Sequence, residues 1–431
     1  MLVIDSLPIL RWAHGGDAVG VPATGPLAGM VVFVPGAVPG DVVRVRVSER
    51  AARFARAEVL AIETPSAERV AAPCEVQAAC GGCPWMIGSA AAQQASREAI
   101  LAGEVRKRLG DAGVDVALEV RPSGPAFGYR QRVRWTYADR QVGYVARGSH
   151  RLVPIRECAV ADPRLTALLP MLREALPAGE SGKVTLLAGA EGVAGWIQPA
   201  ATPGRVFLRD AVSVRFGEAV QLLSPRSFVQ ANPFVTGQIL DDLRRVVRAA
   251  RGGDGDGDGD ADANAARIPH AFELFAGSGT LTQALWAEGY RVTAYEVDAG
   301  AAAAFHATRE GLGVAPERGR WCTNDLLVTG VPERLPGHEG PPDLVLLDPP
   351  RTGAKALVPW LRGTMARTVV YVSCDLATAL RDVSELAGRG ATRRYDVTRL
   401  IAYDMFPHTG HQELMLVLTR RGALARDEST P

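Results

Sequence analysis

Four of the six cysteines are spaced like thiol ligands of a metal. Cys74, Cys80 and Cys83 lie within ten residues, and Cys158 follows 75 residues after the third. This spacing is typical of four-thiolate sites, which hold either zinc or an iron–sulfur cluster. Nearby histidine is absent, and the Gly81-Gly82 step lets the backbone approach a bulky group, which favours the cluster.

Cys374 is a candidate for a different thiol chemistry. It stands in Ser373-Cys374-Asp375, after an apolar strand expected over residues 368–373 and before a helix. A helix amino terminus favours the reactive thiolate, so we interpret Cys374 as a nucleophile rather than a small buried side chain. Glu413 ends the run Pro407-His-Thr-Gly-His-Gln-Glu413 and is a candidate general base.

A glycine-rich turn predicts a nucleoside site. The segment Phe272-Glu-Leu-Phe-Ala-Gly-Ser-Gly-Thr280 places this turn directly after an expected strand, and Glu296 ends the next strand. An acid at that point can accept hydrogen bonds from a ribose diol. The third glycine of the dinucleotide fingerprint is missing, which favours a nucleoside without phosphate. S-adenosylmethionine fits that description.

The segment Asp348-Pro-Pro-Arg351 ends another expected strand and presents Asp348 beside the substrate. Its two prolines stiffen the loop and remove two backbone donors. Enzymes that methylate base amino groups usually carry an aromatic residue after these prolines, and Arg351 stands there instead. The pattern therefore predicts a target atom other than an amino nitrogen.

These motifs fall at the ends of regularly repeated strands. Short apolar strands are expected over 272–275, 291–296, 343–348 and 368–373, alternating with helices, and a last strand over 414–418. Alternation of this kind predicts an α/β fold with a doubly wound, mostly parallel sheet. Ligands of such sheets bind at the carboxyl ends of the strands.

The amino-terminal half predicts RNA-binding surfaces. Strands expected over 29–34, 41–47 and 57–62 favour a small β-barrel, a fold that often binds oligonucleotides. Residues 120–156 hold eight arginines against one acid, on and around a hairpin expected over 130–137 and 141–146. Phosphates would be neutralised by the arginines, and unpaired bases would stack on the interleaved aromatics Tyr129, Trp135, Tyr137 and Tyr144.

Composition excludes several classes of protein. The 431 residues carry 48 basic and 47 acidic side chains, a net charge of +1, and are 47% hydrophobic, so the chain is neither a uniformly basic coat protein nor disordered. No signal peptide or membrane-spanning run is evident, so we expect a cytoplasmic protein, and we expect a monomer. Residues 251–266 are an Asp/Gly-rich linker, and Ala265 stands where a calcium loop needs glutamate.

The motifs together resemble the bacterial family of RNA 5-methyluridine (uracil-C5) methyltransferases. The resemblance rests on Ser-Phe-Val-Gln230-Ala-Asn, Phe-Ala-Gly-Ser-Gly, Asp348-Pro-Pro-Arg, Val-Ser-Cys374-Asp and His-Thr-Gly-His-Gln-Glu413. It covers nearly the whole chain and implies a TRAM barrel over 1–67, a central α+β cluster-binding domain over 68–220, a helical lead-in over 221–250 and a class I methyltransferase domain over 267–421.

The resemblance also implies roles for single residues. It makes Cys374 the nucleophile, Glu413 the base, and Cys74, Cys80, Cys83 and Cys158 the ligands of a 4Fe-4S cluster. Thr280 stands where some relatives have asparagine, and Asn324 is an alternative to Asp325. The implied substrate is RNA, 23S rRNA favoured over tRNA; cytosine-C5 methylation or a non-catalytic iron–sulfur RNA-binding protein are the alternatives. The implied contacts to S-adenosylmethionine and substrate are Gln230, Phe275, Thr280, Glu296, Asp325 and Asp348.

Overall fold

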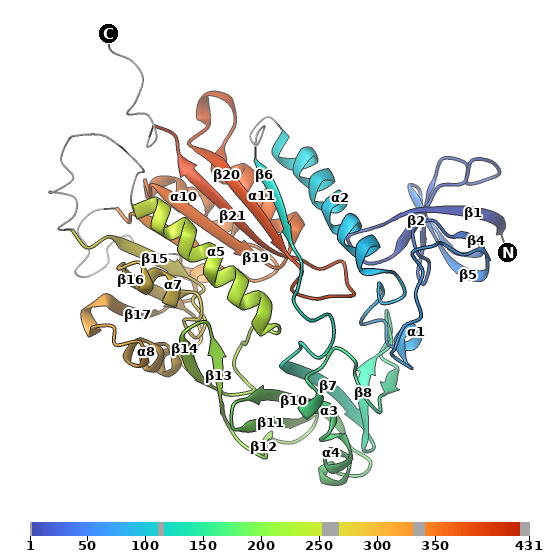
Figure 1. Cartoon of the computed structure of the whole chain (residues 1–431), viewed down its shortest axis with the longest axis horizontal. Helices are drawn as coiled ribbons and strands as arrows, with labels where there is room; N and C mark the ends of the chain where they lie inside the picture. The colour runs from blue at the N-terminus through green and yellow to red at the C-terminus, as the bar shows by residue number, and fades with distance from the viewer. Residues whose placement is uncertain (1, 111–115, 252–266, 331–340, 423–431) are drawn as a thin grey trace.

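The computed structural model describes residues 2–110, 116–251, 267–330 and 341–422, which form a barrel, a central domain and a sheet-based domain (Figure 1). The predicted linker at 251–266 lies outside the described residues apart from Arg251. None of the described helices has the length and apolar character needed to span a membrane.

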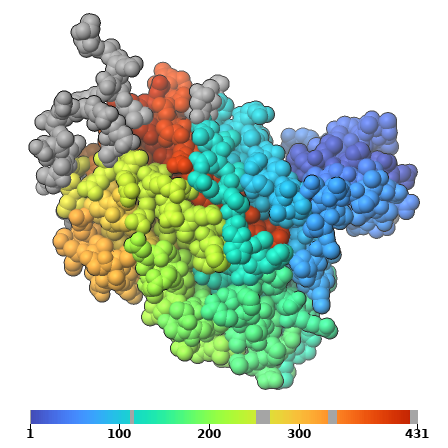
Figure 2. Space-filling model, viewed as in Figure 1, coloured from blue at the N-terminus to red at the C-terminus, as the bar shows by residue number. Residues whose placement is uncertain are grey.

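The amino-terminal barrel has five strands in the order β1-β2-β3-β5-β4 and is closed. It protrudes from the rest of the molecule as a separate lobe (Figure 2). Strands β3, β4 and β5 match the three expected strands, whereas β1 and β2 were not predicted. β1 mixes polar and apolar residues around Pro8 without clean alternation. The strands are β1 (Val3–Trp12), β2 (Ala18–Gly20), β3 (Val31–Val34), β4 (Val42–Arg50) and β5 (Phe54–Thr64).

The central domain is built on a six-stranded sheet in the order β12-β11-β10-β7-β8-β9, followed by the two-stranded β13-β14 hairpin. Helices α1 (Gln77–Cys80), α3 (Pro163–Thr166) and α4 (Leu169–Ala175) accompany it. The predicted basic hairpin is confirmed as β7 and β8. The strands are β7 (Arg132–Ala138), β8 (Gln141–Val145), β9 (Leu152–Pro154), β10 (Ser181–Gly189), β11 (Gly192–Pro199), β12 (Arg205–Phe207), β13 (Val212–Phe216) and β14 (Ala219–Leu223).

The predicted stacking role is wrong for three of the four aromatics, Tyr129, Trp135 and Tyr137, while Tyr144 is half-buried. Trp135 and Tyr137 are 0% exposed and Tyr129 is 2% exposed, because their rings fill the cores of this domain. Rings in a core cannot stack on RNA bases. The exposed part of the predicted surface is its arginines, which are Arg134, Arg140, Arg147, Arg151 and Arg156.

The third domain is the predicted doubly wound sheet. Its eight strands run in the order β17-β16-β15-β18-β19-β21-β20-β6, and the first five are parallel to one another. β21 is antiparallel to both of its neighbours. The strands are β6 (Ala117–Arg121), β15 (His270–Leu274), β16 (Arg291–Glu296), β17 (Gly319–Thr323), β18 (Leu344–Leu347), β19 (Thr368–Ser373), β20 (Tyr395–Tyr403) and β21 (Glu413–Arg420).

Helices cover both faces of this sheet. One apolar core joins the sheet to α5, α7 and α8, and a second joins it to α2, α10 and α11. Such double coverage explains why the strands are apolar throughout. The helices are α2 (Ala90–Leu109), α5 (Pro233–Arg251), α7 (Thr282–Ala287), α8 (Ala301–Gly311), α9 (Leu326–Thr329), α10 (Val358–Gly363) and α11 (Leu376–Ala387), with 3-10 turns at Pro316–Arg318, Lys355–Leu357 and Gly390–Thr392.

The expected central domain at 68–220 is divided in space. Within it, β6 adds to the edge of the eight-stranded sheet by pairing in parallel with β20, and α2 packs on α11. The reason is that α2 has an apolar face, with Leu101, Val105 and Leu109 buried against the sheet domain. Figure 1 shows α2 lying between the barrel and the sheet, so this helix links the two.

Candidate active site at the carboxyl ends of the parallel strands

The glycine-rich turn follows β15 and opens towards solvent at one point. Phe275, Gly277 and Gly279 all have positive φ, of 63°, 53° and 81°. A side chain at Gly279 would collide with Phe305, 2.9 Å away, whereas a side chain at Gly277 would meet nothing within 4 Å. Gly279 is therefore needed for packing, and the open space over Gly277 is available to a ligand.

Glu296 ends β16 and holds the glycine turn. One carboxylate oxygen accepts a hydrogen bond from Gly277 N at 2.9 Å, and the other accepts from Val297 N and Asp298 N at 2.8 and 3.0 Å. This fixes an acceptor beside the open space over Gly277. The predicted position of an acid for ribose hydroxyls is consistent with this geometry.

Thr280 is directed to a residue that the sequence did not indicate. Its hydroxyl donates to Gln221 Oε1 at 2.9 Å, and Gln221 Nε2 donates to Ser278 O and Thr308 Oγ1 at 3.0 and 3.1 Å. Gln221 is 1% exposed and belongs to β14 of the central domain. A glutamine in a short strand carries no local signal of this long-range contact.

The two candidates after β17 differ in what they do. Asp325 is exposed and caps α9 by accepting from Leu327 N at 3.2 Å. Asn324 is half-buried, its backbone N–H donates to Glu296 O at 2.8 Å, and its side chain accepts a hydrogen bond from Thr329 Oγ1. Both therefore lie next to Glu296, and the structure brings both to the edge of the site.

Acidic side chains gather at these strand ends. Burial, and then the charge of Glu296, raises the pKa of Asp348 to about 7. Burial also raises the pKa of Glu273 to about 8, although Thr282 Oγ1 donates a hydrogen bond to it. Glu273 was not predicted as a site residue, yet a charged residue inside the apolar strand β15 was a signal that could have identified it.

Cys374 follows β19 and precedes Asp375, the residue that caps α11. Burial, and then the charge of Glu413, raises the pKa of the Cys374 thiol. Arg351 opposes this through its charge and a hydrogen bond to the thiol. Burial and the neighbouring carboxyl thus disfavour the thiolate in the free protein, against the effect expected of the helix amino terminus, and the role of Cys374 as nucleophile stays a prediction.

Glu413 is the first residue of β21 and is 3% exposed. Burial, and then the charge of Asp348, raises its pKa well above the usual value, while Arg351 acts in the opposite direction. The charges at three neighbouring strand ends thus shift one another's pKa values. The residues are Asp348, Arg351, Cys374 and Glu413. The structure brings together the predicted nucleophile, the predicted base and the two residues of the Asp-Pro-Pro-Arg loop.

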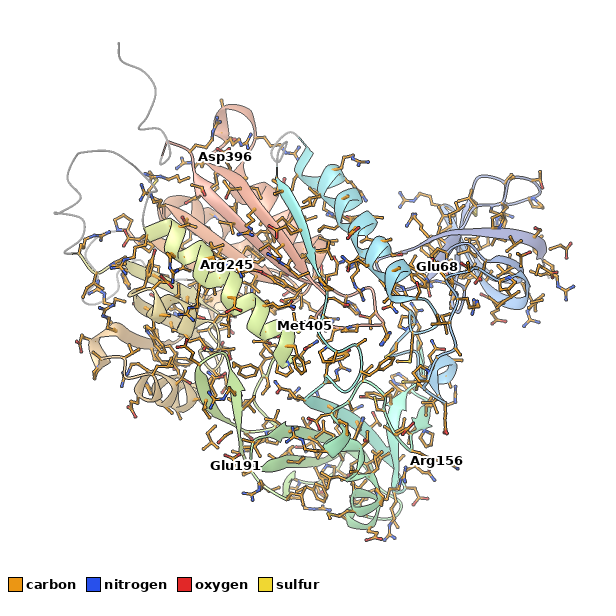
Figure 3. All side chains as sticks on the ribbon, in the orientation of Figure 1. Glu68, Arg156, Glu191, Arg245, Asp396 and Met405 are labelled. Carbon is orange, nitrogen blue, oxygen red and sulfur yellow. The ribbon has the colours of Figure 1, made fainter. Side chains whose placement is uncertain are left out.

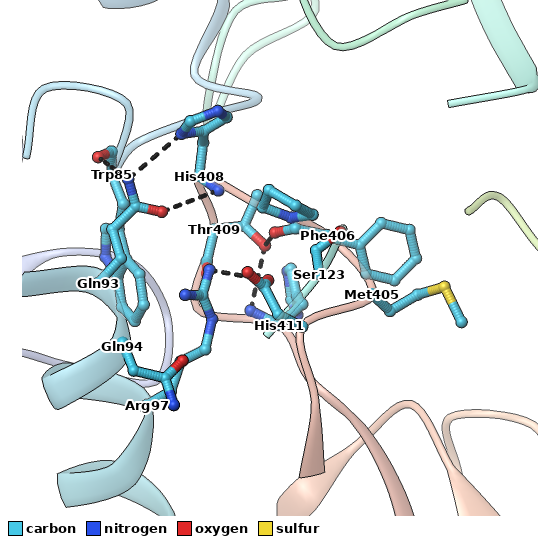
Figure 4. Close-up of polar contacts among 12 residues, drawn as sticks. Trp85, Gln93, Gln94, Arg97, Ser123, Met405, Phe406, His408, Thr409 and His411 are labelled. Atoms are coloured by element: carbon cyan, nitrogen blue, oxygen red, sulfur yellow. Dashed lines mark hydrogen bonds and ion pairs between the residues drawn. The ribbon is translucent and has the colours of Figure 1, made fainter. Parts of the chain in front are cut away.

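The loop before Glu413 is clamped by α2 (Figure 4). Arg97, 2% exposed, forms an ion pair with Asp404 at 2.8 Å and donates to Thr409 O at 3.2 Å. Gln93 contacts His408 at both the backbone N–H, 3.1 Å, and the ring Nδ1, 3.2 Å. Figure 3 labels Met405 in this loop, at the junction of the sheet and the central domain.

His408 is a structural residue of that loop. Its Nε2 lies 3.1 Å from Ala126 O, which accepts only from a protonated nitrogen, so Nδ1 is the acceptor for Gln93 Nε2. Burial lowers the pKa of His408 to about 4. A neutral ring with both nitrogens engaged leaves Glu413, rather than His408, as the base candidate on this loop.

Gln230 lies on the segment between β14 and α5. Its carbonyl accepts from Gln131 Nε2 at 2.9 Å, and the neighbouring Asn232 is fully buried and donates to Ser123 Oγ and Met405 O. These bonds attach the Gln230 segment to the central domain and to the loop before Glu413. The contact of the Gln230 side chain with a cofactor or substrate stays a prediction.

The four clustered cysteines surround a pocket in the central domain. Cys74, Cys80, Cys83 and Cys158 line it together with Arg130 and Tyr144. Burial first, and then neighbouring thiols, raise the pKa of Cys83 to about 12 and also raise those of Cys74 and Cys80. Among the described residues, no three histidine, cysteine or acidic side chains lie close enough together to hold a single metal ion.

Comparisons with known proteins agree with this geometry. Residues 17–60 match the TRAM domain family. The 23S rRNA (uracil(1939)-C(5))-methyltransferase RlmD of Chromohalobacter salexigens is 31% identical and covers 99% of this chain and 91% of its own. RlmD of Halomonas elongata is 30% identical with the same coverage.

The fold has a counterpart among solved structures. The Pyrococcus abyssi tRNA (uracil-54, C5)-methyltransferase, in complex with S-adenosyl-L-homocysteine, aligns with a TM-score of 0.68 at 20% identity and covers 96% of this chain and 100% of its own. The barrel is thus a TRAM domain and the sheet a methyltransferase fold. The chain belongs to the family of RNA uracil-C5 methyltransferases.

Proposed function

We propose that the protein transfers a methyl group from S-adenosylmethionine to carbon 5 of a uridine in RNA, with 23S rRNA as the substrate. The observation that carries this proposal is the meeting of Cys374, Glu413, Asp348 and Arg351 at adjacent strand ends. A protein that only binds RNA needs neither a thiol nor a buried carboxyl at this place. The names of the RlmD relatives support the choice of 23S rRNA.

The carboxyl groups fit a cationic methyl donor. S-adenosylmethionine supplies an activated methyl group on a positively charged sulfonium. Glu273 is buried and Asp348 half-buried, both have raised pKa values, and a cation beside them would favour their ionised forms. We assign the nucleoside to the open space over Gly277. The assigned contacts are Gln230, Phe275, Thr280, Glu296, Asp325 and Asp348, with the Thr280 hydroxyl shared with Gln221.

Cys374 and Glu413 take successive steps. Carbon 5 of uracil becomes nucleophilic only after a thiolate adds to carbon 6. Cys374 supplies that thiolate when its thiol proton leaves to solvent and Arg351 stabilises the remaining charge. After methyl transfer, the proton on carbon 5 must leave before the thiolate is expelled. Glu413 accepts it in its ionised form, which Arg351 favours, and the raised pKa makes that carboxylate a stronger base than an ordinary glutamate.

We also propose that the four-cysteine pocket holds a 4Fe-4S cluster. A single ion needs its ligands within bonding distance of one point, and the described thiols are not so arranged, although they line one pocket. A cubane is larger and suits thiols set further apart. Among the described residues Arg130 Nε is buried there without a hydrogen-bond partner, and a cluster's sulfur atoms would accept from it.

One experiment tests the reaction. Wild-type protein is incubated with 23S rRNA and methyl-labelled S-adenosylmethionine, and the RNA is digested to nucleosides. Label in 5-methyluridine is expected; label in 5-methylcytidine, or none in any RNA offered, would overturn the proposal. Comparing the methylation map of rRNA and tRNA from a deletion strain with that of its parent then identifies the RNA and the uridine.

We further expect a monomeric, cytoplasmic enzyme, as its sequence suggested.

A further inference from the structure

The loop between β1 and β2 connects the barrel to the catalytic domain through direct contacts. The carbonyl of His14 packs against Gly410, where an added Cβ would lie only 2.7 Å from it. Trp85 Nε1 donates to Gly16 O, and Arg147 Nη2 donates to Gly15 O, both at 3.1 Å. The barrel loop is therefore fixed by side chains of the central region and by the loop that leads to Glu413.

The His14 ring has a buried nitrogen and an accessible one. Its Nδ1 is buried and has no hydrogen-bond partner among the described residues. A buried N–H without an acceptor is rarer than a buried acceptor without a donor, which favours the tautomer with the proton on Nε2. Nε2 is not among the buried unpaired atoms and has no partner in the described part of the chain, so it presents a donor to solvent.

A second imidazole faces the first from the other domain. His411 is exposed, and its ring meets that of His14 edge to face with centroids 6.3 Å apart. Its backbone is fixed by Thr409 Oγ1, which accepts from His411 N at 3.2 Å. His411 stands two residues before Glu413. His14 lies near enough to Asp375, the neighbour of Cys374, to contribute to the lowered pKa of Asp375.

The surroundings of the two rings favour an anion. Burial, and then the charge of Arg351, lowers the pKa of His411; Arg130 acts in the same direction and Asp375 in the opposite one. The nearby Asp375 uses its carboxylate to accept from Thr378 N at 2.9 Å. A metal ion is not indicated, because no three potential ligands among the described residues lie close enough together. Two imidazole donors beside a guanidinium match the oxygens of a phosphate.

We propose that His14 and His411 together bind a backbone phosphate of the RNA next to the target uridine. This rests on the proposed function, because a base that reaches Cys374 must be flipped out and brings its flanking phosphates to the mouth of the site. The barrel would then contribute one residue directly to the positioning of the reacting nucleotide. The two rings would act as one site divided between two domains.

The test is a comparison of protein and RNA variants. We measure the Kd of a synthetic RNA fragment that contains the unmethylated target uridine. The proteins are the wild type, His14→Ala, His14→Gln and, as a matched control, His306→Ala on α8. Loss of a hydrogen bond to a charged acceptor predicts about tenfold weaker binding for His14→Ala. His14→Gln keeps a side-chain N–H donor and should recover part of the affinity, while His306→Ala should bind like wild type.

A neutral methylphosphonate at each flanking position then identifies the phosphate. At one position it should weaken wild-type binding about tenfold and His14→Ala binding hardly at all, because the contact is already lost. Unchanged affinity of folded His14→Ala, or additive losses at every phosphate, would overturn the proposal. Failure of the wild type to methylate uridine would instead overturn the proposed function. Affinity for S-adenosylmethionine and the unfolding temperature serve as folding controls and should stay unchanged.

Discussion

The protein holds cysteines in two contrasting surroundings. Cys374 is a single thiol at the end of β19. Arg351 lowers its pKa, and a buried carboxyl, Glu413, raises it. Cys74, Cys80 and Cys83 have other thiols as neighbours, and Cys158 acts on the pKa of all three. Burial raises the pKa at both places, but the second cause differs.

This difference separates a nucleophile from a ligand set. At the catalytic site one negative charge must form, and one guanidinium is enough to stabilise it when the substrate arrives. In the central domain four charges would have to form side by side, and their mutual repulsion keeps them protonated until a multiply charged cation binds. The number of neighbouring thiols, rather than burial, therefore decides the chemistry of each cysteine.

The largest effect is expected at the single thiol. Cys374→Ala should reduce methylation to background and abolish any covalent protein–RNA adduct, because no thiolate can add to carbon 6. Its iron content should equal that of wild type. Methylation is measured by label transfer and the adduct by denaturing electrophoresis.

Cys322→Ala is the matched control for that variant. Cys322 is also a half-buried free cysteine and lies on β17 of the same sheet. It should retain methylation close to the wild-type rate. Substantial activity of Cys374→Ala, or equal losses in both variants, would contradict the assignment of Cys374 as the nucleophile.

The next effect is expected at the base. Glu413→Gln should slow turnover by about 10²–10⁴-fold, the usual cost of losing a general base. Addition and methyl transfer can still occur, so a methylated adduct should accumulate and survive denaturing electrophoresis. A folded variant that binds RNA and turns over normally would exclude Glu413, and His411 would be the remaining histidine to test, since His408 is held neutral.

The ligand set should respond differently. Anaerobically purified wild-type protein should be brown and contain about four irons, and Cys158→Ala should lose them. We expect a smaller loss of methylation than in Glu413→Gln, because the pocket lies in the central domain rather than at the strand ends. Iron and zinc are measured by elemental analysis. A colourless wild-type protein with one equivalent of zinc would contradict the cluster.

Much of the catalytic half could be predicted from sequence because its signals are local. Phe275, Glu296, Asp348 and Cys374 each directly follow or end a short apolar strand, and parallel strands bring their carboxyl ends to one edge. Local motifs with a fixed place in the fold are therefore informative about geometry.

The residues that were missed depend on contacts between distant segments. Gln221 reaches Thr280 from another domain, and β6 joins the sheet across a separation of about 280 residues, between Glu119 and Ile401. The hairpin aromatics were misplaced because alternation shows that Trp135 and Tyr137 share a face of the strand, but not whether that face is covered. Helix α4 and the rest of the central core bury it.

The smallest effect is expected at Glu273, a buried carboxyl at the catalytic end of the sheet. It tests whether ionising this carboxyl destabilises the folded protein. Its pKa is raised from 4.5 to about 8 in the folded state, so between these values the folded protein keeps a proton that the unfolded chain releases. Unfolding therefore becomes more favourable as pH rises, and this contribution to stability is lost between about pH 4.5 and 8.

Glu273→Gln cannot ionise and can still accept from Thr282 Oγ1. It should be more stable than wild type by about 1–4 kcal/mol at pH 8, with the difference vanishing near pH 4.5. Urea unfolding at both pH values measures this, with the exposed Glu317→Gln as control. A Glu273→Gln variant that is less stable than wild type at pH 8 would show that the carboxylate is paired in the folded protein rather than held protonated.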